Sequence, residues 1–357
     1  MDNKLNIFAS SKVANEKDKV KAYLNGEKIF PTTIELDLTQ LCNRACPGCP
    51  YLSSRKPGLT LQLPFLDRLF SILGPETPGI VLSGGEPTIV PHFPETVALA
   101  KKKGFQDIAV ISNGGMTHLP KIQDALLENV TSIRFSLYDW QDTEGKYFYD
   151  LLEKIRNLRN RIEREGSKLE IGASILTRSK LNHRYHSVGM QALDAGIHWL
   201  YFHPYCIDWD TDHPIKDDQT NVLETLEELK LKVPKNANIQ VPTERYSMEP
   251  LHFEKLHGSH FLIQVGADGI NYAGPECKYH EEAALLDLNE YMENDFLWHP
   301  QRIERINQLN SENYRYIGTK HRPPMFSHHI QKLIDNKTKD YKLNNEKIQK
   351  FSYPNII

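Results

Sequence analysis

The sequence predicts an α/β protein: a partial (β/α)6 TIM-like barrel followed by a smaller α+β C-terminal extension. Two observations predict this fold. Between residues 34 and 205, short apolar runs alternate with longer amphipathic segments, which is typical of strands and helices in a parallel sheet. The alternation gives six strand–helix units, too few for a complete eight-stranded barrel and suited to an open one. We expect the working residues at the C-terminal ends of these strands.

The predicted strands are rich in Ile, Val and aromatic residues, as buried parallel strands are. They are Ile34–Leu38, Ile80–Ser83, Ile108–Ser112, Ser132–Leu137, Leu169–Leu176 and Trp199–His203. The segments between them place apolar residues on one helical face. Pro64 favours the start of the first of these helices, and Gly104, Gly166 and Gly196 favour helix ends.

The pattern changes after residue 205. Phe261–Tyr272 contains the turn Ala267-Asp268-Gly269 and predicts a hairpin. Residues 331–357 are polar and lysine-rich, which predicts a surface helix or a mobile tail. The predicted division is therefore an N-terminal segment at 1–31, a core at 32–206, an extension at 207–330 and a polar tail at 331–357.

Composition bounds the class of protein. The chain has 357 residues, 39% hydrophobic and 25% charged, with a formal net charge of −3. No global basic field attracts it to nucleic acid or to an anionic membrane, and no apolar run approaches the roughly 20 residues of a spanning helix. Five cysteines, three of them close together, do not resemble a secreted disulfide framework. A cytoplasmic protein is predicted, with no nucleic-acid partner and no membrane association.

Three cysteines, Cys42, Cys46 and Cys49, directly follow the first predicted strand. Three thiolates can bind one face of a [4Fe-4S] cluster and leave one iron without a protein ligand. Such an iron can chelate a further molecule and pass it an electron. The spacing also leaves a zinc site open, since structural zinc takes four ligands. Cys206, Cys277 or one of the 15 histidines would then supply the fourth.

A second motif, Gly84-Gly85-Glu86-Pro87, follows the second predicted strand. Paired glycines let the backbone approach a ligand closely. The Glu86 carboxylate and nearby carbonyl groups can accept hydrogen bonds from an ammonium group. Alone, such a tetrapeptide is more often a turn than a site. At the C-terminal end of a strand, across the barrel mouth from three clustered cysteines, it is far more specific.

Over residues 32–205, the two motifs resemble the radical S-adenosylmethionine superfamily. That family is marked by a CxxxCxxC loop after strand one and a GGEP-like motif after strand two. The resemblance implies two cofactors, a [4Fe-4S] cluster on Cys42, Cys46 and Cys49 and S-adenosylmethionine on its fourth iron. The cluster would cleave S-adenosylmethionine reductively, and the 5′-deoxyadenosyl radical would abstract a hydrogen atom from the substrate.

The resemblance also implies partners. A peptide or protein substrate is expected, with a small molecule (a nucleotide, sugar or natural-product precursor) as the alternative. The electron would come from a reductant such as flavodoxin or ferredoxin. Two other classes of function stay open: a non-catalytic zinc or iron–sulfur binding protein, and an electron-transfer protein whose cluster has four ligands.

The resemblance carries roles to further positions. Gly84, Gly85, Glu86 and Pro87 are expected to bind S-adenosylmethionine, and so are four residues near later strand ends: Ser112, Asn113, Ser136 and Arg178. Ser112 and Asn113 would lie near the ribose, Ser136 near the methionine moiety and Arg178 near its carboxylate. The alternative for Arg178 is a solvated loop cation.

Two residues are candidates for contact with substrate. His203 would reach the ribose or the substrate; alternatively it is a satisfied imidazole at the edge of the core. Cys206 could donate a hydrogen atom to a product radical, although such a cysteine is more often a small buried hydrophobe. The two are therefore the predicted catalytic residues.

The C-terminal part resembles the opening of a SPASM or twitch extension, on Gly266–Tyr272, Cys277 and Leu285–Leu288. Such extensions hold auxiliary iron–sulfur clusters and are common in enzymes that modify peptides and proteins. Beyond the three clustered cysteines the chain has only Cys206 and Cys277, too few for the usual four-cysteine ligation. We expect a degenerate extension without an auxiliary cluster.

Overall fold

The computed structural model describes residues 16–46, 49, 59–138, 145–206, 219–234, 237–336 and 355–356. Its strands are β1 (Thr33–Thr39), β2 (Gly79–Gly84), β3 (Asp107–Ser112), β4 (Ser132–Ser136), β5 (Glu170–Thr177), β6 (Trp199–Pro204), β7 (Asn238–Gln240), β8 (Leu262–Val265), β9 (Ile270–Tyr272) and β10 (Ala284–Asp287). All six predicted strands are confirmed as β1 to β6. The predicted hairpin is confirmed as β8 and β9, which pair antiparallel.

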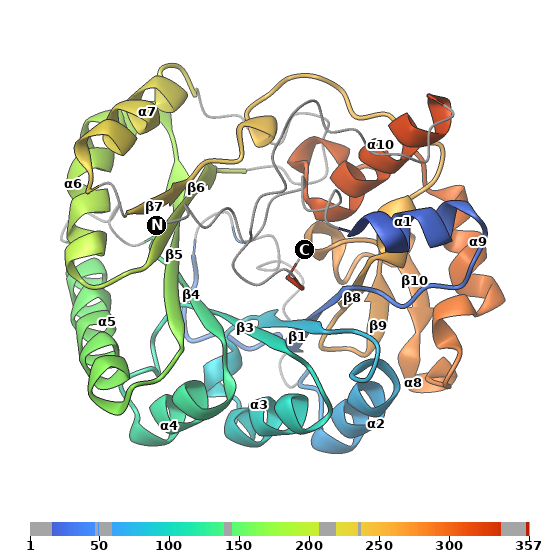
Figure 1. Cartoon of the computed structure of the whole chain (residues 1–357), viewed down its shortest axis with the longest axis horizontal. Helices are drawn as coiled ribbons and strands as arrows, with labels where there is room; N and C mark the ends of the chain where they lie inside the picture. The colour runs from blue at the N-terminus through green and yellow to red at the C-terminus, as the bar shows by residue number, and fades with distance from the viewer. Residues whose placement is uncertain are drawn as a thin grey trace.

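These strands make a ten-stranded sheet in the order β10-β9-β8-β1-β2-β3-β4-β5-β6-β7. β8 and β1 through β7 are parallel, whereas β9 and β10 are antiparallel additions beyond β8. The parallel strands curve into a barrel that stays open between β7 and β8 (Figure 1). The predicted mixed α/β fold with an incomplete parallel barrel is therefore confirmed.

The helices are α1 (Lys17–Leu24), α2 (Leu63–Leu73), α3 (Phe93–Lys102), α4 (Pro120–Asn129), α5 (Lys146–Glu165), α6 (Asn182–Asp194), α7 (Val222–Lys232), α8 (Leu288–Tyr291), α9 (Pro300–Gln308) and α10 (Arg322–Asp335). α2 through α7 cover the outer face of the barrel (Figure 1). Helix α5 buries an apolar stripe that includes Leu151, Ile155 and Ile162. It ends at Gly166 with φ +65°, as its sequence predicts.

The two faces of each strand differ in polarity. In β1, Ile34 and Leu36 are buried in the core shared with the outer helices. Glu35 and Asp37, which alternate with them, face the interior of the barrel and contact Lys278 there, because successive strand residues point to opposite faces. The barrel interior is therefore lined partly by charged groups.

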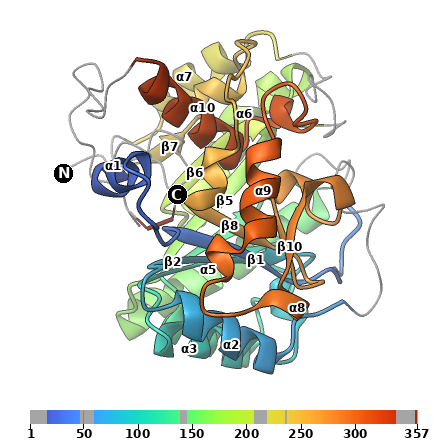
Figure 2. The same cartoon turned by 90° about the vertical axis from the view of Figure 1, so that its right-hand side faces the viewer.

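The C-terminal part shares the sheet of the barrel. β7 pairs with β6, and β8 pairs with β1, although both lie within the predicted extension. Figure 2 shows α8, α9 and β10 beside the barrel. A second core holds this part together; its buried members are Leu251, Phe253, Leu256, Tyr272, Ala273, Cys277, Ala283, Leu285, Ile306, Tyr314, Tyr316 and Met325. A third core joins α1 to α10 through residues that include Val20, Phe326 and Ile330.

Residues 355–356 lie on the inner side of the barrel, since Ile356 packs against strand residues that alternate with the outer core, and Figure 1 marks the C-terminus of the chain inside the barrel. Ile356 is fully buried against a group that includes Val81 and Trp199. The carbonyl oxygen of Asn355 accepts a hydrogen bond from Thr33 Oγ1 at 2.6 Å. These two residues therefore do not behave as part of a solvated tail; positions 337–354 and 357 of the predicted tail lie outside the described residues.

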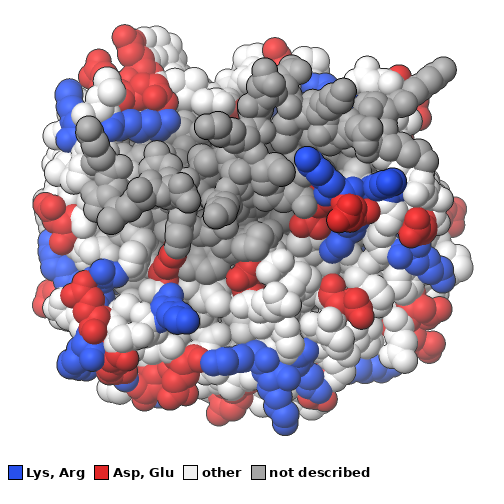
Figure 3. Space-filling model, viewed as in Figure 1, with Lys and Arg blue, Asp and Glu red and all other residues white. Residues whose placement is uncertain are grey.

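Surface charge agrees with the small net charge. On the face shown in Figure 3, the described acidic and basic side chains are interspersed around the periphery. Among the described helices, none combines the length and the apolarity needed to cross a membrane.

Candidate active site

The three clustered cysteines occupy the loop that leaves β1. None of the five cysteines, all of which the structure describes, forms a disulfide, and Cys42, Cys46 and Cys49 are only half-buried. The Cys49 amide donates to the Cys46 carbonyl oxygen at 3.3 Å. In the described ranges, no three His, Cys, Asp or Glu side chains lie close enough together to hold a metal ion, so the three thiols share one loop without converging. Three accessible thiols on one loop fit an iron–sulfur cluster by donor type.

The paired glycines hold the second motif against that cysteine loop. The Gly85 amide donates to Thr39 O at 2.7 Å, and the Glu86 amide donates to Leu41 O at 2.8 Å. A Cβ on Gly85 would lie 2.0 Å from Leu41 O, and Gly84 has φ +121°. The glycines are therefore required by close approach to the protein's own backbone, one residue before Cys42.

Glu86 is completely buried. Its Oε1 accepts hydrogen bonds from the Thr88 amide at 3.1 Å, from the Thr88 hydroxyl and from Ser112 Oγ at 2.8 Å. Its Oε2 accepts from the Asn113 amide at 2.6 Å. Burial raises the pKa of Glu86, and the hydrogen bonds from Thr88, Asn113 and Ser112 oppose that rise. Both carboxylate oxygens thus have partners within the protein, and contact with a cofactor ammonium group stays a prediction.

The end of β3 joins the two motifs. The Asn113 side-chain amide donates to Asn43 Oδ1 at 2.8 Å and to Cys42 Sγ at 3.6 Å. Its Oδ1 accepts from the Gly115 amide at 2.8 Å. Asn113 therefore touches the cysteine loop with its side chain and the buried Glu86 with its backbone. Pro87, next to Glu86, is buried and opens a short 3-10 turn.

The later strand ends bring further predicted residues to the same edge. Ser136, the last residue of β4, is half-buried. Arg178 follows β5, and its guanidinium lies 4.0 Å from the centre of the Tyr205 ring. That stacking shows that Arg178 is not simply a solvated loop cation. Its pairing with a methionine carboxylate stays a prediction.

His203 and Cys206 lie at the end of β6. The His203 ring contacts that of Tyr201, with centroids 5.2 Å apart. Burial, together with the charges of Arg245 and Arg134, lowers the pKa of His203 well below its ordinary value, so its imidazole is neutral at pH 7. Cys206 is buried beside Arg245, and burial raises its pKa. The catalytic roles of His203 and Cys206 stay predictions.

Sequence reasoning missed a charged group inside the barrel. Lys278 Nζ donates to Asp37 Oδ1 at 2.6 Å and to Glu35 Oε1 at 3.4 Å. The Tyr279 hydroxyl donates to Asp37 Oδ2 at 2.7 Å, and Arg322 pairs with Glu35. The signal was present: Glu35 and Asp37 alternate with apolar residues in a predicted buried strand, where carboxylates need buried partners.

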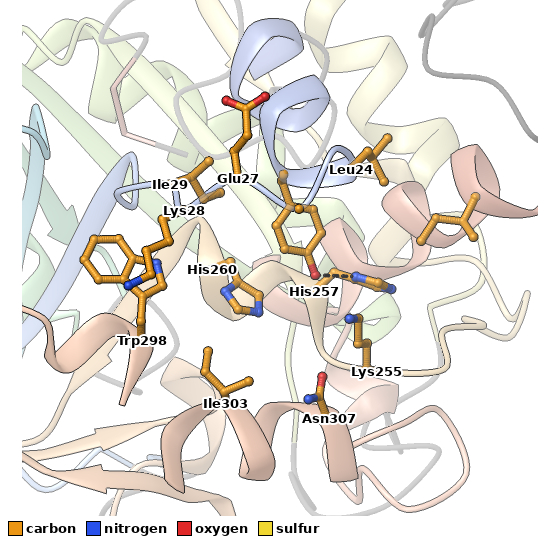
Figure 4. Close-up of a pocket in the computed structure, with 13 residues that line it drawn as sticks. Leu24, Glu27, Lys28, Ile29, Lys255, His257, His260, Trp298, Ile303 and Asn307 are labelled. Atoms are coloured by element: carbon orange, nitrogen blue, oxygen red, sulfur yellow. Dashed lines mark hydrogen bonds between the residues drawn. The ribbon is translucent and has the colours of Figure 1, made fainter. Parts of the chain in front are cut away.

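A pocket of about 490 Å³ lies elsewhere, between α1, α9 and the segment before β8 (Figure 4). Tyr23, His257, His260 and Trp298 contribute to its walls. The Tyr23 hydroxyl and His257 Nδ1 are 2.8 Å apart, and burial lowers the pKa of His257 to about 4. None of the predicted site residues lines this pocket.

An open parallel barrel with a three-cysteine loop after β1, tied to a Gly-Gly-Glu-Pro turn after β2, is the arrangement that the resemblance to the radical SAM superfamily predicts. Residues 36–171 match the family model described as the Radical SAM superfamily. The superfamily consists of enzymes that use S-adenosylmethionine, and it implies a [4Fe-4S] cluster as the second cofactor.

Solved structures resemble the chain over most of its length. SuiB of Streptococcus suis, bound to its precursor peptide SuiA, superposes with a TM-score of 0.63 at 13% identity, covering 91% of this chain and 78% of that one. The protein anSMEcpe, with bound AdoMet and a peptide named Kp18Cys, gives a TM-score of 0.55 at 13% identity, covering 85% and 98%. At these identities the likeness shows the fold.

A curated relative matches a shorter stretch. The 7,8-dihydro-6-hydroxymethylpterin dimethyltransferase of Methanocaldococcus jannaschii is 34% identical over 110 residues. The match covers 28% of this chain and 22% of that protein. The chain thus spans about a fifth of the length of this relative.

Proposed function

We propose that this chain is a radical SAM enzyme that modifies a peptide or protein substrate. It would cleave S-adenosylmethionine reductively and use the resulting radical to remove a substrate hydrogen atom. The observation that carries the proposal is the link through Asn113, whose amide groups contact both Glu86 of the second motif and Cys42 of the cysteine loop. A structural turn that happened to read Gly-Gly-Glu-Pro would not need to be tied to a loop that carries three cysteines.

In this proposal the residues of the chain hold and orient the two cofactors. Cys42, Cys46 and Cys49 would hold the cluster, which supplies the electron that splits the sulfonium of S-adenosylmethionine. Glu86 is a positioning residue, because its hydrogen bonds from Ser112 and Asn113 fix the ends of β2 and β3 relative to each other. Ser136 and Arg178 would contact the methionine moiety from the ends of β4 and β5.

The peptide substrate is supported by the fold beyond the barrel. The likeness to SuiB, a protein solved with a precursor peptide, extends over 91% of this chain, so it reaches well beyond the strands β1 to β6 into the part of the chain that follows residue 206. A protein reductant such as flavodoxin or ferredoxin would deliver the electron.

A second candidate is a small-molecule substrate. The specific observation in its favour is the 34% identity to a pterin dimethyltransferase, which exceeds the identity to the peptide-bound structures. That match is confined to 28% of the chain, whereas the substrate specificity of a barrel enzyme depends on loops and extensions over the whole chain.

Anaerobic reconstitution followed by reduction tests the proposed function. The expected result is 5′-deoxyadenosine formed from S-adenosylmethionine, and its loss when Cys42, Cys46 and Cys49 are replaced by alanine. The double variant Cys206→Ala with Cys277→Ala should still form it. Reduced protein that holds a cluster but forms no 5′-deoxyadenosine would instead support an electron-transfer protein.

A further inference from the structure

The charged side chains of the barrel interior differ in their partners: Lys278 and Arg322 form ion pairs, whereas Arg245 has no ion pair among the described residues. Lys278 pairs with Asp37 and Glu35, and Arg322 pairs with Glu35. These contacts engage both carboxylates of β1. Asp37 and Glu35 are therefore already paired with Lys278 and Arg322.

Arg245 enters the interior from the segment that follows β7, on the open side of the barrel. Three of its side-chain neighbours are the Tyr201 hydroxyl, the Cys206 thiol and His321 Nε2, the last at 3.5 Å. None of these three is a carboxylate. Glu276 is near enough for the charge of Arg245 to lower its pKa, but its Oε1 accepts from Tyr314 and its Oε2 has no hydrogen-bond partner among the described residues. The Nε atom of Arg245 is inaccessible to solvent and has no hydrogen-bond partner among the described residues.

His203 provides a second polar atom at the same place. Its ring contacts that of Tyr201, with centroids 5.2 Å apart, and Tyr201 is also a hydrogen-bond partner of Arg245. His203 Nδ1 is likewise buried without a hydrogen-bond partner in the part of the chain that is described. Buried polar atoms are normally satisfied, so two unsatisfied ones on side chains that share the neighbour Tyr201 point to a missing ligand.

The position suits a substrate. His203 is the second-last residue of β6, and Cys206 follows three residues later, at the same edge of the sheet as the cysteine loop after β1. Working residues of parallel barrels lie at this edge. A group held by Arg245 and His203 would therefore lie at the mouth of the barrel rather than in its outer helical layer.

We propose that Arg245 and His203 form a recognition site for a carboxylate group of the substrate. The planar guanidinium can donate two parallel hydrogen bonds to a carboxylate, and the neutral imidazole can donate one more. This inference rests on the proposed function and adds the chemical class of the substrate. The carboxylate could belong to an acidic peptide or to a small organic acid, and the experiment separates the two sources.

The test uses reconstituted, S-adenosylmethionine-loaded protein and matched probes. The peptide probe is a pool of hexapeptides containing Asp and Glu with free C-termini, compared with the same pool carrying Asn, Gln and C-terminal amides. The small-molecule probe is glutarate compared with glutaramide. Retention is measured by ultrafiltration and mass spectrometry for the wild type, Arg245→Gln and Arg245→Lys.

The expected result is preferential retention of one carboxylate probe over its amide, by about 10- to 100-fold. Arg245→Gln should abolish the preference and Arg245→Lys should keep part of it. Affinity for S-adenosylmethionine should be the same in all three proteins. Equal retention of acid and amide by the wild type, including no retention of either, would overturn the proposal.

Two further outcomes also have a definite meaning. Loss of S-adenosylmethionine binding in Arg245→Gln would place the cofactor's own carboxylate on Arg245 and overturn the substrate role. Formation of 5′-deoxyadenosine is measured in parallel. If the wild type forms it without any carboxylate preference, this inference fails alone; if the wild type does not form it, the proposed function fails.

Discussion

The Asn113 backbone amide donates a 2.6 Å hydrogen bond to Oε2 of the completely buried Glu86. The same asparagine contacts Cys42 Sγ through its side chain. The cysteine loop and the Gly-Gly-Glu-Pro turn, 35 positions apart in sequence from Cys49 to Gly84, are thereby fixed to each other and to the end of β3. Glu86 therefore holds the two motifs in place, and both of its carboxyl oxygens accept hydrogen bonds from protein donors.

Glu86→Gln should therefore lower stability as well as cofactor affinity. A carboxamide offers one acceptor oxygen where four donors now converge, so at least one buried donor loses its partner, at a cost of about 1–3 kcal/mol. We expect a lower unfolding midpoint, weaker S-adenosylmethionine binding by equilibrium dialysis, and unchanged iron content. Ser112→Ala, which removes one of the donors, is the milder control. Weaker binding with unchanged stability would show that Glu86 contacts the cofactor directly.

Replacing Cys42, Cys46 and Cys49 together by alanine should abolish the cluster. Reconstituted wild type should contain about four irons with matching acid-labile sulfide, and the cluster should be sensitive to oxygen because one iron lacks a thiolate. The triple variant should contain neither metal nor sulfide. A full cluster in that variant would refute the assignment of the site, and zinc without sulfide in the wild type would favour a zinc protein.

The sequence predicted the parts of the fold that depend on local pattern. The strands β1 to β6 are recognisable because each is a run of apolar residues between helical segments. β7 was missed because Asn238–Gln240 is only three residues long and has one apolar member, Ile239. The partners of Glu86 were missed for a different reason: its donors, Ser112 and Asn113, are brought to it only by the pairing of β2 with β3.

The contacts inside the barrel could not be predicted for the same reason, because they join residues that are far apart in the sequence. The cysteines and the Gly-Gly-Glu-Pro turn are local motifs, so their positions could be predicted. Arg245 is separated from His203 by 42 positions in the sequence, and no local pattern singles it out. The burial of Ile356 was also unpredictable, because its neighbours Val81 and Trp199 lie in distant strands.

Stability should depend on pH through Glu276. Burial raises its pKa from 4.5 to about 7, although the hydrogen bond from the Tyr314 hydroxyl opposes the rise. Between pH 4.5 and 7 the folded protein therefore holds a proton that the unfolded chain releases, so the free energy of unfolding falls as pH rises, by about 3 kcal/mol in all. Urea unfolding across this range should show the slope. Glu276→Gln should flatten it, whereas the same change at the exposed Glu304 should not.

The segment at Asn355 and Ile356 should contribute measurably to stability. Ile356→Ala removes a fully buried side chain and should cost about 2–5 kcal/mol. Gly79→Ala should act on the same contact, since a Cβ there would lie 1.8 Å from Asn355 O. Ile334→Ala, at an exposed isoleucine, should stay within about 0.5 kcal/mol of the wild type. Equal unfolding midpoints for Ile356→Ala and Ile334→Ala would show that the segment does not occupy the barrel in solution.

The last prediction concerns Cys206 and Cys277. Both thiols are buried, and burial raises the pKa of each, most strongly at Cys277. Cys277 lies 3.5 Å from the Tyr314 hydroxyl and donates to the Gly274 carbonyl oxygen at 3.3 Å, contacts that suit a neutral thiol better than a thiolate ligand. The double change Cys206→Ala and Cys277→Ala should therefore leave the iron content at about four per chain.

Iron content, the formation of 5′-deoxyadenosine and product, and stability separate the possible roles of the two cysteines. Wild-type protein with about eight irons, falling to about four in the variant, would reveal an auxiliary cluster and contradict the degenerate extension. Unchanged iron with 5′-deoxyadenosine but no product would assign a thiol to the substrate radical, and the single variants would identify which one. Because Cys206 lies beside Arg245 at the end of β6 while Cys277 is packed in the second core, we expect any catalytic effect to follow Cys206→Ala and any loss of stability to follow Cys277→Ala.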